Sequence, residues 1–146
     1  MSGSREAKLL IGLLLRQSHQ RASRALNEAL APLGLTGRHF GVMLLIDRDG
    51  VSTQRDLIRQ TGSDKAGMVR TVEDLESLGY LERSQSPADK RVSDLTLTDA
   101  GRTAFATARG RAAQTANGLL EPFTDAELEV FTSLLVRFVG GLRSDD

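Results

Sequence analysis

The sequence predicts a mostly α-helical domain that carries one small β-hairpin. Apolar residues recur at helical spacing through long stretches at both ends of the chain. Between them, a short helix, a tight turn and a second helix follow one another, and two short segments with strand-like alternation come directly afterwards. This order is typical of a winged helix-turn-helix, a module that places one helix in the major groove of DNA.

The composition fits one globular domain of 146 residues. Hydrophobic residues make up 40% of the chain and charged residues 26%, an ordinary globular mixture that can form a core. The 19 basic and 19 acidic side chains give a net charge of zero, whereas many nucleic-acid-binding domains are strongly basic. A local basic patch is sufficient for binding, so the average charge does not decide the function.

Several features that other functions need are absent from the sequence. The chain has no cysteine, which excludes disulfides, cysteine-ligated zinc and a thiol-based oxidant sensor. It has no phosphate-binding glycine loop, nucleophile elbow or metal-ligand spacing, so we expect neither an enzyme nor a cofactor. The apolar run Leu9–Leu15 is too short to cross a membrane and lacks a signal-peptide cleavage site. We therefore expect a cytoplasmic protein with no membrane partner.

The N-terminal part of the chain is predicted to be one long helix. It runs from about Arg5 to Leu30 and is ended by Pro32 and Gly34. A helix of this length at a chain terminus more often packs against a partner subunit or against the other end of the chain. Its apolar positions at helical spacing are Leu10, Leu13, Leu14, Ala22, Ala25, Leu26, Ala29 and Leu30.

The C-terminal part holds two more predicted helices. Thr98 caps the first, which is rich in alanine and so suited to a close helix crossing, and Pro122 ends it. Thr124 and Glu127 form a capping box at the start of the last helix. Because the terminal helices have apolar faces, we expect a dimerisation layer. The apolar stripe of the last helix consists of Leu128, Phe131, Leu134, Leu135, Phe138 and Leu142.

Two shorter helices are predicted in the centre of the chain. Thr36 caps the first of them, and Asp49–Gly50 ends it. Ser52 caps the second, which carries Leu57 and Ile58, and Thr61–Gly62 forms the turn after it. The apolar face of the first helix comprises Phe40, Met43, Leu44 and Ile46.

The helix after this turn has charges sorted along its length. Ser63 or Asp64 caps it, Lys65 and Arg70 lie near its start, and its acids lie near its end, where they oppose the helix dipole. Either the N-terminal half meets phosphate while the C-terminal half stays in solvent, or the face is an ordinary solvated one. The predicted buried residues are Met68, Val72, Leu75 and Leu78. The predicted exposed residues are Ala66, Gly67, Arg70, Glu73, Asp74 and Ser77.

A β-hairpin is predicted next. Gly79 ends the preceding helix, and Tyr80–Ser86 has room for one strand. Pro87–Lys90 forms the loop. Val92–Leu97 alternates as the second strand, with two leucines, Leu95 and Leu97, on one face.

These residues resemble the MarR family of transcriptional regulators, named for multiple antibiotic resistance. The resemblance covers about residues 35–102 in motif and the rest of the chain in helix order. It is carried first by Asp64-Lys65-Ala66-Gly67-Met68-Val69-Arg70, Leu75-Glu76, Leu78-Gly79-Tyr80-Leu81 and Arg83. It is carried further by Asp89-Lys90-Arg91, Leu95-Thr96-Leu97-Thr98 and Gly101-Arg102, and upstream by Leu35-Thr36, Phe40, Leu44, Gln54, Leu57 and Gly62.

The resemblance implies a homodimer that binds a pseudo-palindromic operator on double-stranded DNA, usually as a repressor of a nearby gene. Residues 1–146 would form a single domain. Residues 5–34 and 98–146 would be its dimerisation helices, and residues 35–97 its winged helix-turn-helix lobe. Each wing would enter a minor groove, and each recognition helix would lie in a major groove.

The predicted wing contact is the tripeptide Asp89, Lys90 and Arg91. An arginine at a hairpin tip suits a narrow minor groove with enhanced negative potential. Asp89 cannot itself favour DNA, so we expect it to accept hydrogen bonds from Arg91 and fix the direction of the guanidinium. The alternative is a solvated surface pair worth less than about 1 kcal/mol.

The predicted major-groove and phosphate contacts lie on the two central helices. Arg70 is the best candidate for a bidentate contact to guanine, with a structural pair to Asp74 as the alternative. Ser52 is explained equally well as a helix cap alone. The predicted major-groove residues are Lys65, Ala66, Gly67 and Arg70, and Ser63 is a further predicted DNA contact. The predicted phosphate contacts are Ser52, Thr53, Gln54 and Arg55.

The resemblance also implies a pocket for a small-molecule effector, often an aromatic or phenolic acid. The candidate residues are His19, His39 and Met43, although each histidine alone is more often a core or interface residue. Sensing of oxidants or urate is not expected, because the relatives that do so use cysteine or tryptophan, and this chain has neither.

Two other functions remain open at this point. A winged helix can serve as a protein–protein interaction module without sequence-specific DNA binding. In that case replacing Arg70 or Arg91 would leave the partner bound. A non-specific architectural DNA binder is the other alternative, and the net charge of zero argues against it.

Overall fold

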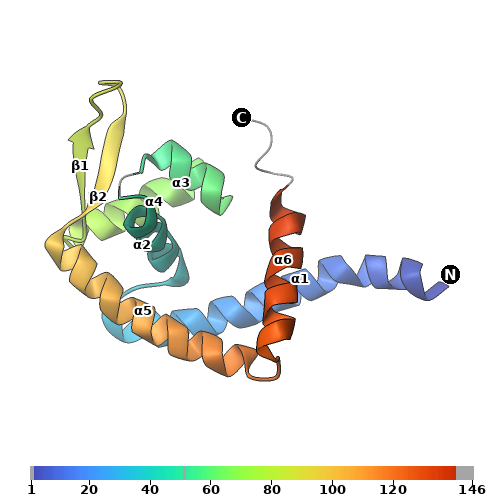
Figure 1. Ribbon diagram of the computed structural model, residues 1–146. Helices are drawn as coiled ribbons and strands as arrows, with labels where there is room; N and C mark the ends of the chain where they lie inside the picture. The colour runs from blue at the N-terminus through green and yellow to red at the C-terminus, as the bar shows by residue number, and fades with distance from the viewer. Residues whose placement is uncertain (1, 51, 141–146) are drawn as a thin grey trace.

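The computed structural model describes residues 2–50 and 52–140 and contains the predicted series of elements (Figure 1). In chain order they are α1 (Ser2–Leu30), the 3₁₀ turn η1 (Ala31–Leu33), α2 (Gly37–Asp49), α3 (Gln54–Thr61), α4 (Lys65–Ser77), β1 (Leu81–Gln85), β2 (Ser93–Leu97), α5 (Asp99–Leu120) and α6 (Asp125–Gly140). This order confirms the predicted mostly helical fold with one β-hairpin. The predicted stripe residue Leu142 lies outside the described residues.

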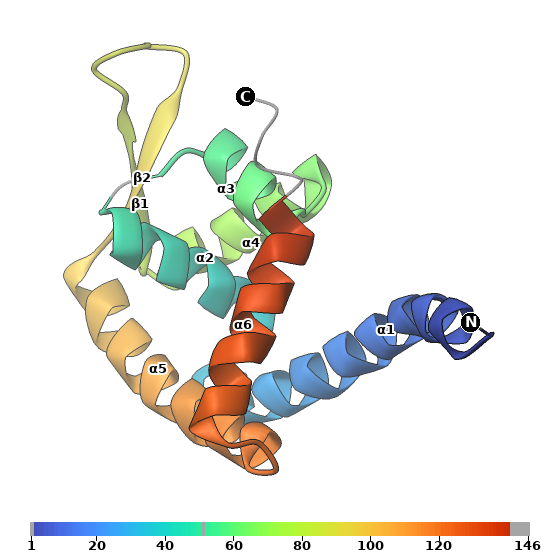
Figure 2. The ribbon, with the colours of Figure 1, turned by 45° about the vertical axis from the view of Figure 1, so that its right-hand side comes forward.

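The elements form a lobe that sits on a pair of long helices (Figures 1 and 2). The lobe consists of α2, α3 and α4, and the antiparallel hairpin β1–β2 projects from it. Helix α5 runs from the base of the hairpin, packs against α1 and leads to α6. The N-terminal half of α1 extends away from the rest of the chain in both views. Its large apolar residues are exposed, namely Leu9, Leu10, Ile11, Leu13 and Leu14.

The core joins the lobe to α5. The ring of Phe40 on α2 stacks on that of Phe105 on α5 with their centroids 5.6 Å apart. Burial of a large apolar side chain is worth about 1.5–3 kcal/mol, so this cluster fixes the lobe on the long helices. Its fully or almost fully buried members include Leu30, Val42, Met43, Ile46, Leu57, Val72, Leu75, Leu95 and Ala108.

Three of the predicted helix caps are confirmed. Thr36, Thr98 and Thr124 precede α2, α5 and α6. Of the two residues predicted as alternatives for α4, Asp64 is the cap: its carboxylate accepts from the amide of Gly67 at 2.6 Å. Each such cap satisfies backbone amides that the helix leaves without partners.

The predicted cap of α3 is wrong by one residue. Thr53, not Ser52, caps the helix, because its hydroxyl accepts from the amide of Asp56 at 3.1 Å. Ser52 instead exchanges two backbone hydrogen bonds with Leu95 of β2, at 3.1 and 2.7 Å. This pairing holds Ser52 in a strand-like position beside the hairpin and moves the start of the helix one residue along the chain.

Leu44, predicted on the apolar face of α2, and Leu78, predicted to be buried, are both exposed. Leu44 has an exposed fraction of 42%, because the buried face of α2 is centred on Val42, Met43 and Ile46. Leu78 has an exposed fraction of 45% because it stands at the C-cap of α4, where the chain turns away from the lobe. Both leucines therefore lie outside the core of the single chain.

The start of α5 is locked against the base of the hairpin. The amide of Thr98 donates to the carbonyl of Tyr80 at 3.0 Å, and the hydroxyl of Thr98 donates to the carbonyl of Gly79 at 2.6 Å. Gly101 lies so close to the residue before β1 that a Cβ atom there would be 2.1 Å from the carbonyl oxygen of Tyr80. Only glycine fits this position, which accounts for the Thr98…Gly101 pattern in the sequence.

No single helix among the described residues is long and apolar enough to cross a membrane. One pair of consecutive helical segments, residues 3–33 and 37–49, is long and apolar enough when the two are taken together. These segments are bent by 82° relative to each other.

We expect Gly101→Ala to destabilise the fold, because the new methyl group would collide with backbone rather than with a flexible side chain. Overpacking of this kind costs about 1–3 kcal/mol. At this chain length each kcal/mol lowers Tm by about 2–4 °C. The control is Gly110→Ala on the same helix, where a Cβ would meet nothing within 4 Å and where alanine is the better helix former. Equal melting temperatures for wild type and Gly101→Ala would contradict this view of the junction.

Candidate nucleic-acid interface

Helices α3 and α4 are joined by a tight turn that depends on a glycine. Gly62 has a φ of +73°, a left-handed conformation that other residues rarely adopt, and its amide donates to the carbonyl of Ile58 at 2.9 Å. The hydroxyl of Thr61 donates to the carbonyl of Leu57 at 2.6 Å and accepts from the amide of Ser63 at 3.2 Å. These bonds complete the backbone of the turn and orient α4 relative to α3, as in a helix-turn-helix.

The outer side of α4 carries most of the predicted major-groove contacts. Lys65, Ala66 and Arg70 are all exposed in the N-terminal half of the helix. The opposite side is buried in the core through Met68, Val72 and Leu75, together with Thr71. The helix can therefore offer Lys65, Ala66 and Arg70 to a partner without any change of the fold.

Gly67 does not belong to this exposed face, which corrects its predicted position. It is buried, and its amide is the donor to the capping carboxylate of Asp64. A Cβ at Gly67 would lie 2.9 Å from that carboxylate and 3.2 Å from the hydroxyl of Ser63, which is itself half-buried. There is little space around Gly67, and the side chains of Ser63 and Asp64, rather than a bound partner, occupy it. Contact of Ser63 and Gly67 with DNA stays a prediction.

The acids near the end of α4 have structural partners. Asp74 accepts from the ring Nε2 of His39 on α2 at 2.9 Å. Glu76 pairs with Arg83 on β1 through Nε at 2.9 Å and Nη2 at 2.8 Å. These two pairs tie the helix to α2 and to the hairpin, and they explain why carboxylates stand where the helix dipole disfavours them. Arg70 makes no ion pair among the described residues, so the alternative pair with Asp74 is not formed.

The tip of the hairpin presents Arg91. Its side chain has an exposed fraction of 90%. Asp89 accepts from the backbone amide of Arg91 at 3.0 Å, from its Nε at 3.2 Å and from its Nη2 at 3.3 Å. The predicted hydrogen bonds from Arg91 to Asp89 are therefore present. Lys90, the third predicted wing residue, is also exposed, and its carbonyl accepts from the side chain of Gln85 at 3.0 Å.

The same contacts lower the pKa of the Asp89 carboxyl below its ordinary value. The largest cause is the side-chain hydrogen bond from Arg91, followed by the hydrogen bond from its backbone amide. Both stabilise the ionised carboxylate. The loop conformation is thus favoured above the ordinary pKa and loses this support as the pH falls through the lowered one.

The predicted phosphate contacts at the start of α3 are not equivalent. Arg55 is exposed, and Thr53 uses its hydroxyl as the helix cap. Ser52 is buried beside β2. The side-chain nitrogen of Gln54 is buried and has no hydrogen-bond partner among the described residues. Arg55 is therefore the side chain of this group that can reach a phosphate most directly.

The three residues predicted for an effector pocket are not brought together around a cavity of the single chain. His19 is exposed on α1, whereas Met43 has no exposed surface and belongs to the core. His39 is buried and bonded to both Thr36 and Asp74. Their part in ligand binding stays a prediction.

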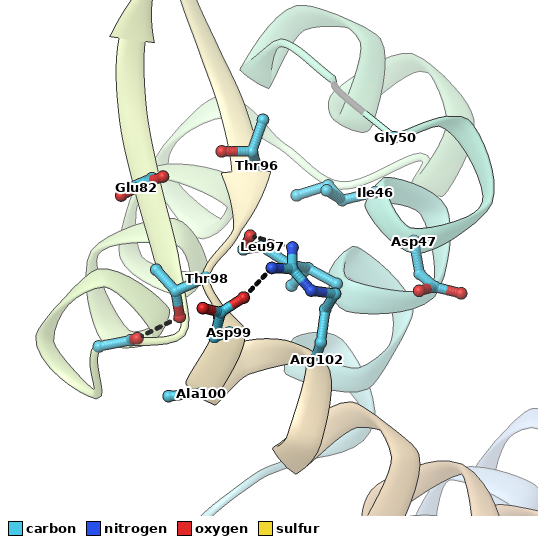
Figure 3. A pocket seen from close by; sticks show the side chains of 11 residues that line it. Ile46, Asp47, Gly50, Glu82, Thr96, Leu97, Thr98, Asp99, Ala100 and Arg102 are labelled. Carbon is cyan, nitrogen blue, oxygen red and sulfur yellow. Dashed lines mark hydrogen bonds and ion pairs between the residues drawn. The ribbon is translucent and has the colours of Figure 1, made fainter.

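A hollow with a volume of about 720 Å³ lies elsewhere in the described part of the chain (Figure 3). It is bounded by the end of α2, the base of the hairpin and the start of α5. Asp47, Glu82 and Asp99 give it an acidic lining, and Arg102 pairs with Asp99 and donates to the carbonyl of Leu97 at 3.0 Å. A polar, open hollow of this kind can hold solvent and has no residue in common with the predicted effector site.

Comparison with known proteins agrees with this geometry. A profile of the MarR family matches residues 33–92, which include α2, the helix-turn-helix, β1 and the hairpin loop. The multiple antibiotic resistance protein MarR of Escherichia coli is 32% identical over 91 residues, which are 62% of this chain and 63% of that protein. The crystal structure of a mutant of E. coli MarR in complex with operator DNA superposes with a TM-score of 0.81 at 28% identity. It covers 92% of this chain and 96% of that one. In sequence and in fold, the chain is similar to regulators of the MarR family.

A second solved MarR-like structure shows a bound small molecule. CouR from Rhodococcus jostii, crystallised with p-coumaroyl-CoA, superposes with a TM-score of 0.80 at 27% identity over 88% of this chain and 90% of that one. The MarR relatives of this chain are transcriptional regulators, not enzymes.

Two features of this MarR-like lobe could not be found from the sequence. The bond between His39 and Asp74 joins residues 35 positions apart, and no local pattern indicates it. Gly101 was noted only as part of the Gly101-Arg102 motif, and the sequence alone does not show that it lies against Tyr80. The spacing of Thr36 and His39 did carry a signal, because the third helical position is where a capping box places its second polar residue.

We expect the pKa of Asp89 to rise toward its ordinary value of 3.8 in an Arg91→Ala variant, because the main cause of its depression is removed. Carbon-detected NMR titration of the side-chain carboxyl measures this directly. The control is Arg83→Ala, which removes an arginine of the same hairpin that pairs with Glu76 instead. An Asp89 midpoint that is the same in wild type and Arg91→Ala would show that the bond does not persist in solution.

Proposed function

We propose that this chain is a dimeric, sequence-specific regulator of transcription that binds a pseudo-palindromic site on double-stranded DNA and represses a nearby gene. The observation that carries the proposal is that Arg70 on α4 and Arg91 on the hairpin are both available to a partner. Both are exposed, and they stand on a fold that superposes on E. coli MarR bound to operator DNA.

Helix α4 would enter the major groove. Its exposed N-terminal half offers a guanidinium, an ammonium group and a methyl group through Arg70, Lys65 and Ala66. An arginine can bond two acceptors of guanine at once, and a methyl group suits contact with thymine. Since α4 has carboxylates in its second half, base contacts are expected from its first half.

The hairpin and α3 would add contacts to the backbone and the minor groove. Arg91 is always charged, and Asp89 fixes its direction, which suits insertion into a narrow minor groove. Arg55 and Lys90 are exposed and can neutralise phosphates. Because few cations are involved and the net charge is zero, we expect a shallow dependence of affinity on salt.

The terminal helices would form the dimer, with residues 5–34 and 98–146 as the dimerisation part and residues 35–97 as the DNA-binding lobe. Support comes from the apolar side chains that the single chain leaves exposed on α1 and α6. They include Leu9, Leu13, Leu14, Val130, Phe131, Leu134 and Phe138. An exposed apolar surface of this extent is typical of an interface between subunits.

A small-molecule effector, of aromatic or phenolic character, would release the DNA. Support comes from CouR with its bound p-coumaroyl-CoA. The ligand would act by changing the spacing of the two recognition helices, since half-sites about 34 Å apart demand a fixed separation. His19, His39 and Met43 remain the candidates for this site. As a regulator of this kind, the protein is not an enzyme and works in the cytoplasm with the DNA that it controls.

Selection of bound sequences from a random duplex library tests the proposal. We expect wild type to enrich an inverted repeat with half-site centres about 10–10.5 base pairs apart. Arg91→Ala should weaken binding to that repeat. Arg70→Ala should relax the preference at one base pair per half-site, where a bidentate contact is worth about 1–3 kcal/mol.

Two controls accompany the selection. Arg109→Ala removes an exposed arginine of α5 away from the hairpin and should leave the enriched sequence unchanged. Light scattering should give twice the 15.8 kDa of the chain. If no sequence is enriched even at low salt, the proposal of sequence-specific binding is wrong.

A further inference from the structure

His39 lies in the first turn of α2, and its side chain bonds to Asp74 on the recognition helix α4. The ring is buried, and the amide of Thr36 donates to its Nδ1 at 2.9 Å. Because Nδ1 accepts this bond, the ring proton is on Nε2, which donates to the carboxylate of Asp74 at 2.9 Å. Both ring nitrogens of His39 are therefore hydrogen-bonded, Nδ1 to Thr36 and Nε2 to Asp74.

Asp74 has a second cationic neighbour within its own helix. Arg70 precedes it by four residues, a spacing that places two helical side chains next to each other and that favours an ion pair. Both side chains are on the exposed side of α4, and the side chain of Asp74 has an exposed fraction of 60%. In the structure the carboxylate bonds to His39, and Arg70 forms no ion pair among the described residues.

We propose that His39 is a positioning residue for DNA recognition. By holding the carboxylate of Asp74 against α2, it keeps Asp74 from pairing with Arg70 and leaves the guanidinium available for a base. The inference rests on the proposed function, because it assigns His39 a role in the contact made by Arg70.

The expected effect follows from the strength of the competing pair. An ion pair at this helical spacing favours the paired state by about twofold, so pairing would lower the available fraction of Arg70 by about two- to threefold. A dimer that uses Arg70 in both half-sites would lose about four- to ninefold in operator affinity. The loss should be confined to the selected operator, since binding to random duplex does not depend on a guanine contact.

The test uses the full-length dimer and the duplex obtained by selection with wild type. His39→Leu removes both ring nitrogens at similar volume, and fluorescence anisotropy should show the four- to ninefold loss in affinity. Adding Asp74→Asn to this variant removes the competing carboxylate and should restore the affinity to within about twofold of wild type. If His39 acted only in packing, the double variant would bind no better than His39→Leu, and this result would overturn the proposal.

A matched control separates the effect of Asp74 from that of charge alone. Asp47→Asn neutralises an exposed carboxylate on α2 instead of α4. In the His39→Leu background it should not restore the lost affinity. Recovery with Asp47→Asn equal to that with Asp74→Asn would also overturn the proposal, because a general loss of negative charge would then be sufficient.

A measurement without DNA makes failure of this inference distinguishable from failure of the proposed function. Thermal unfolding of the single and double variants Arg70→Ala and Asp74→Asn gives the coupling between these two side chains. We expect no coupling in wild type and a favourable coupling in the His39→Leu background. Zero coupling in both backgrounds would refute the competition even if the operator is bound as proposed. Coupling only in His39→Leu, with no operator selected by wild type, would refute the proposed function alone.

Discussion

One face of α4 is buried in the core, and this constraint decides which side chains the helix can present. Met68, Val72 and Leu75 face inward, so Lys65 and Arg70 must face outward. The burial of three large side chains, at about 1.5–3 kcal/mol each, is much stronger than any single polar contact at the surface. The orientation of the recognition helix is therefore set by apolar packing, and its polar contacts refine it.

The polar contacts act mainly at the ends of elements. Asp64 caps the start of α4, and bonds from His39 and Arg83 hold the acids near its end. At the other boundary of the lobe, Gly101 allows α5 to begin directly against the hairpin. Each of these contacts connects α4 or the hairpin to a neighbour. Together they keep the outer face of α4 and the hairpin tip in one fixed arrangement, as two adjacent grooves of DNA would require.

The helices, the hairpin and most of the caps could be predicted because their signals are local: apolar periodicity, a capping residue, a glycine after the last turn. The errors concern side-chain and backbone contacts that the spacing of residues does not show. Ser52 was predicted as a cap because its pairing with Leu95, 43 residues later, has no signature in a single sequence. Gly67 was placed on the outer face because spacing alone does not show that the side chains before it fold back over it. The bond between His39 and Asp74 has no local signal, because it joins residues 35 positions apart. At the site, the exposure of Arg70 and the hydrogen bonds within the wing could be predicted. The bonds from the carboxylates of α4 to α2 and to the hairpin could not.

The most direct test of the account is amide hydrogen exchange of the dimer with and without its selected operator. The account predicts slower exchange on DNA binding in residues 63–70, at the start of α4, and in residues 86–92, at the hairpin tip. It predicts no added protection along α5. Protection confined to α1 and α6, with none at α4 or the hairpin, would contradict the claim that this face of the lobe binds the DNA.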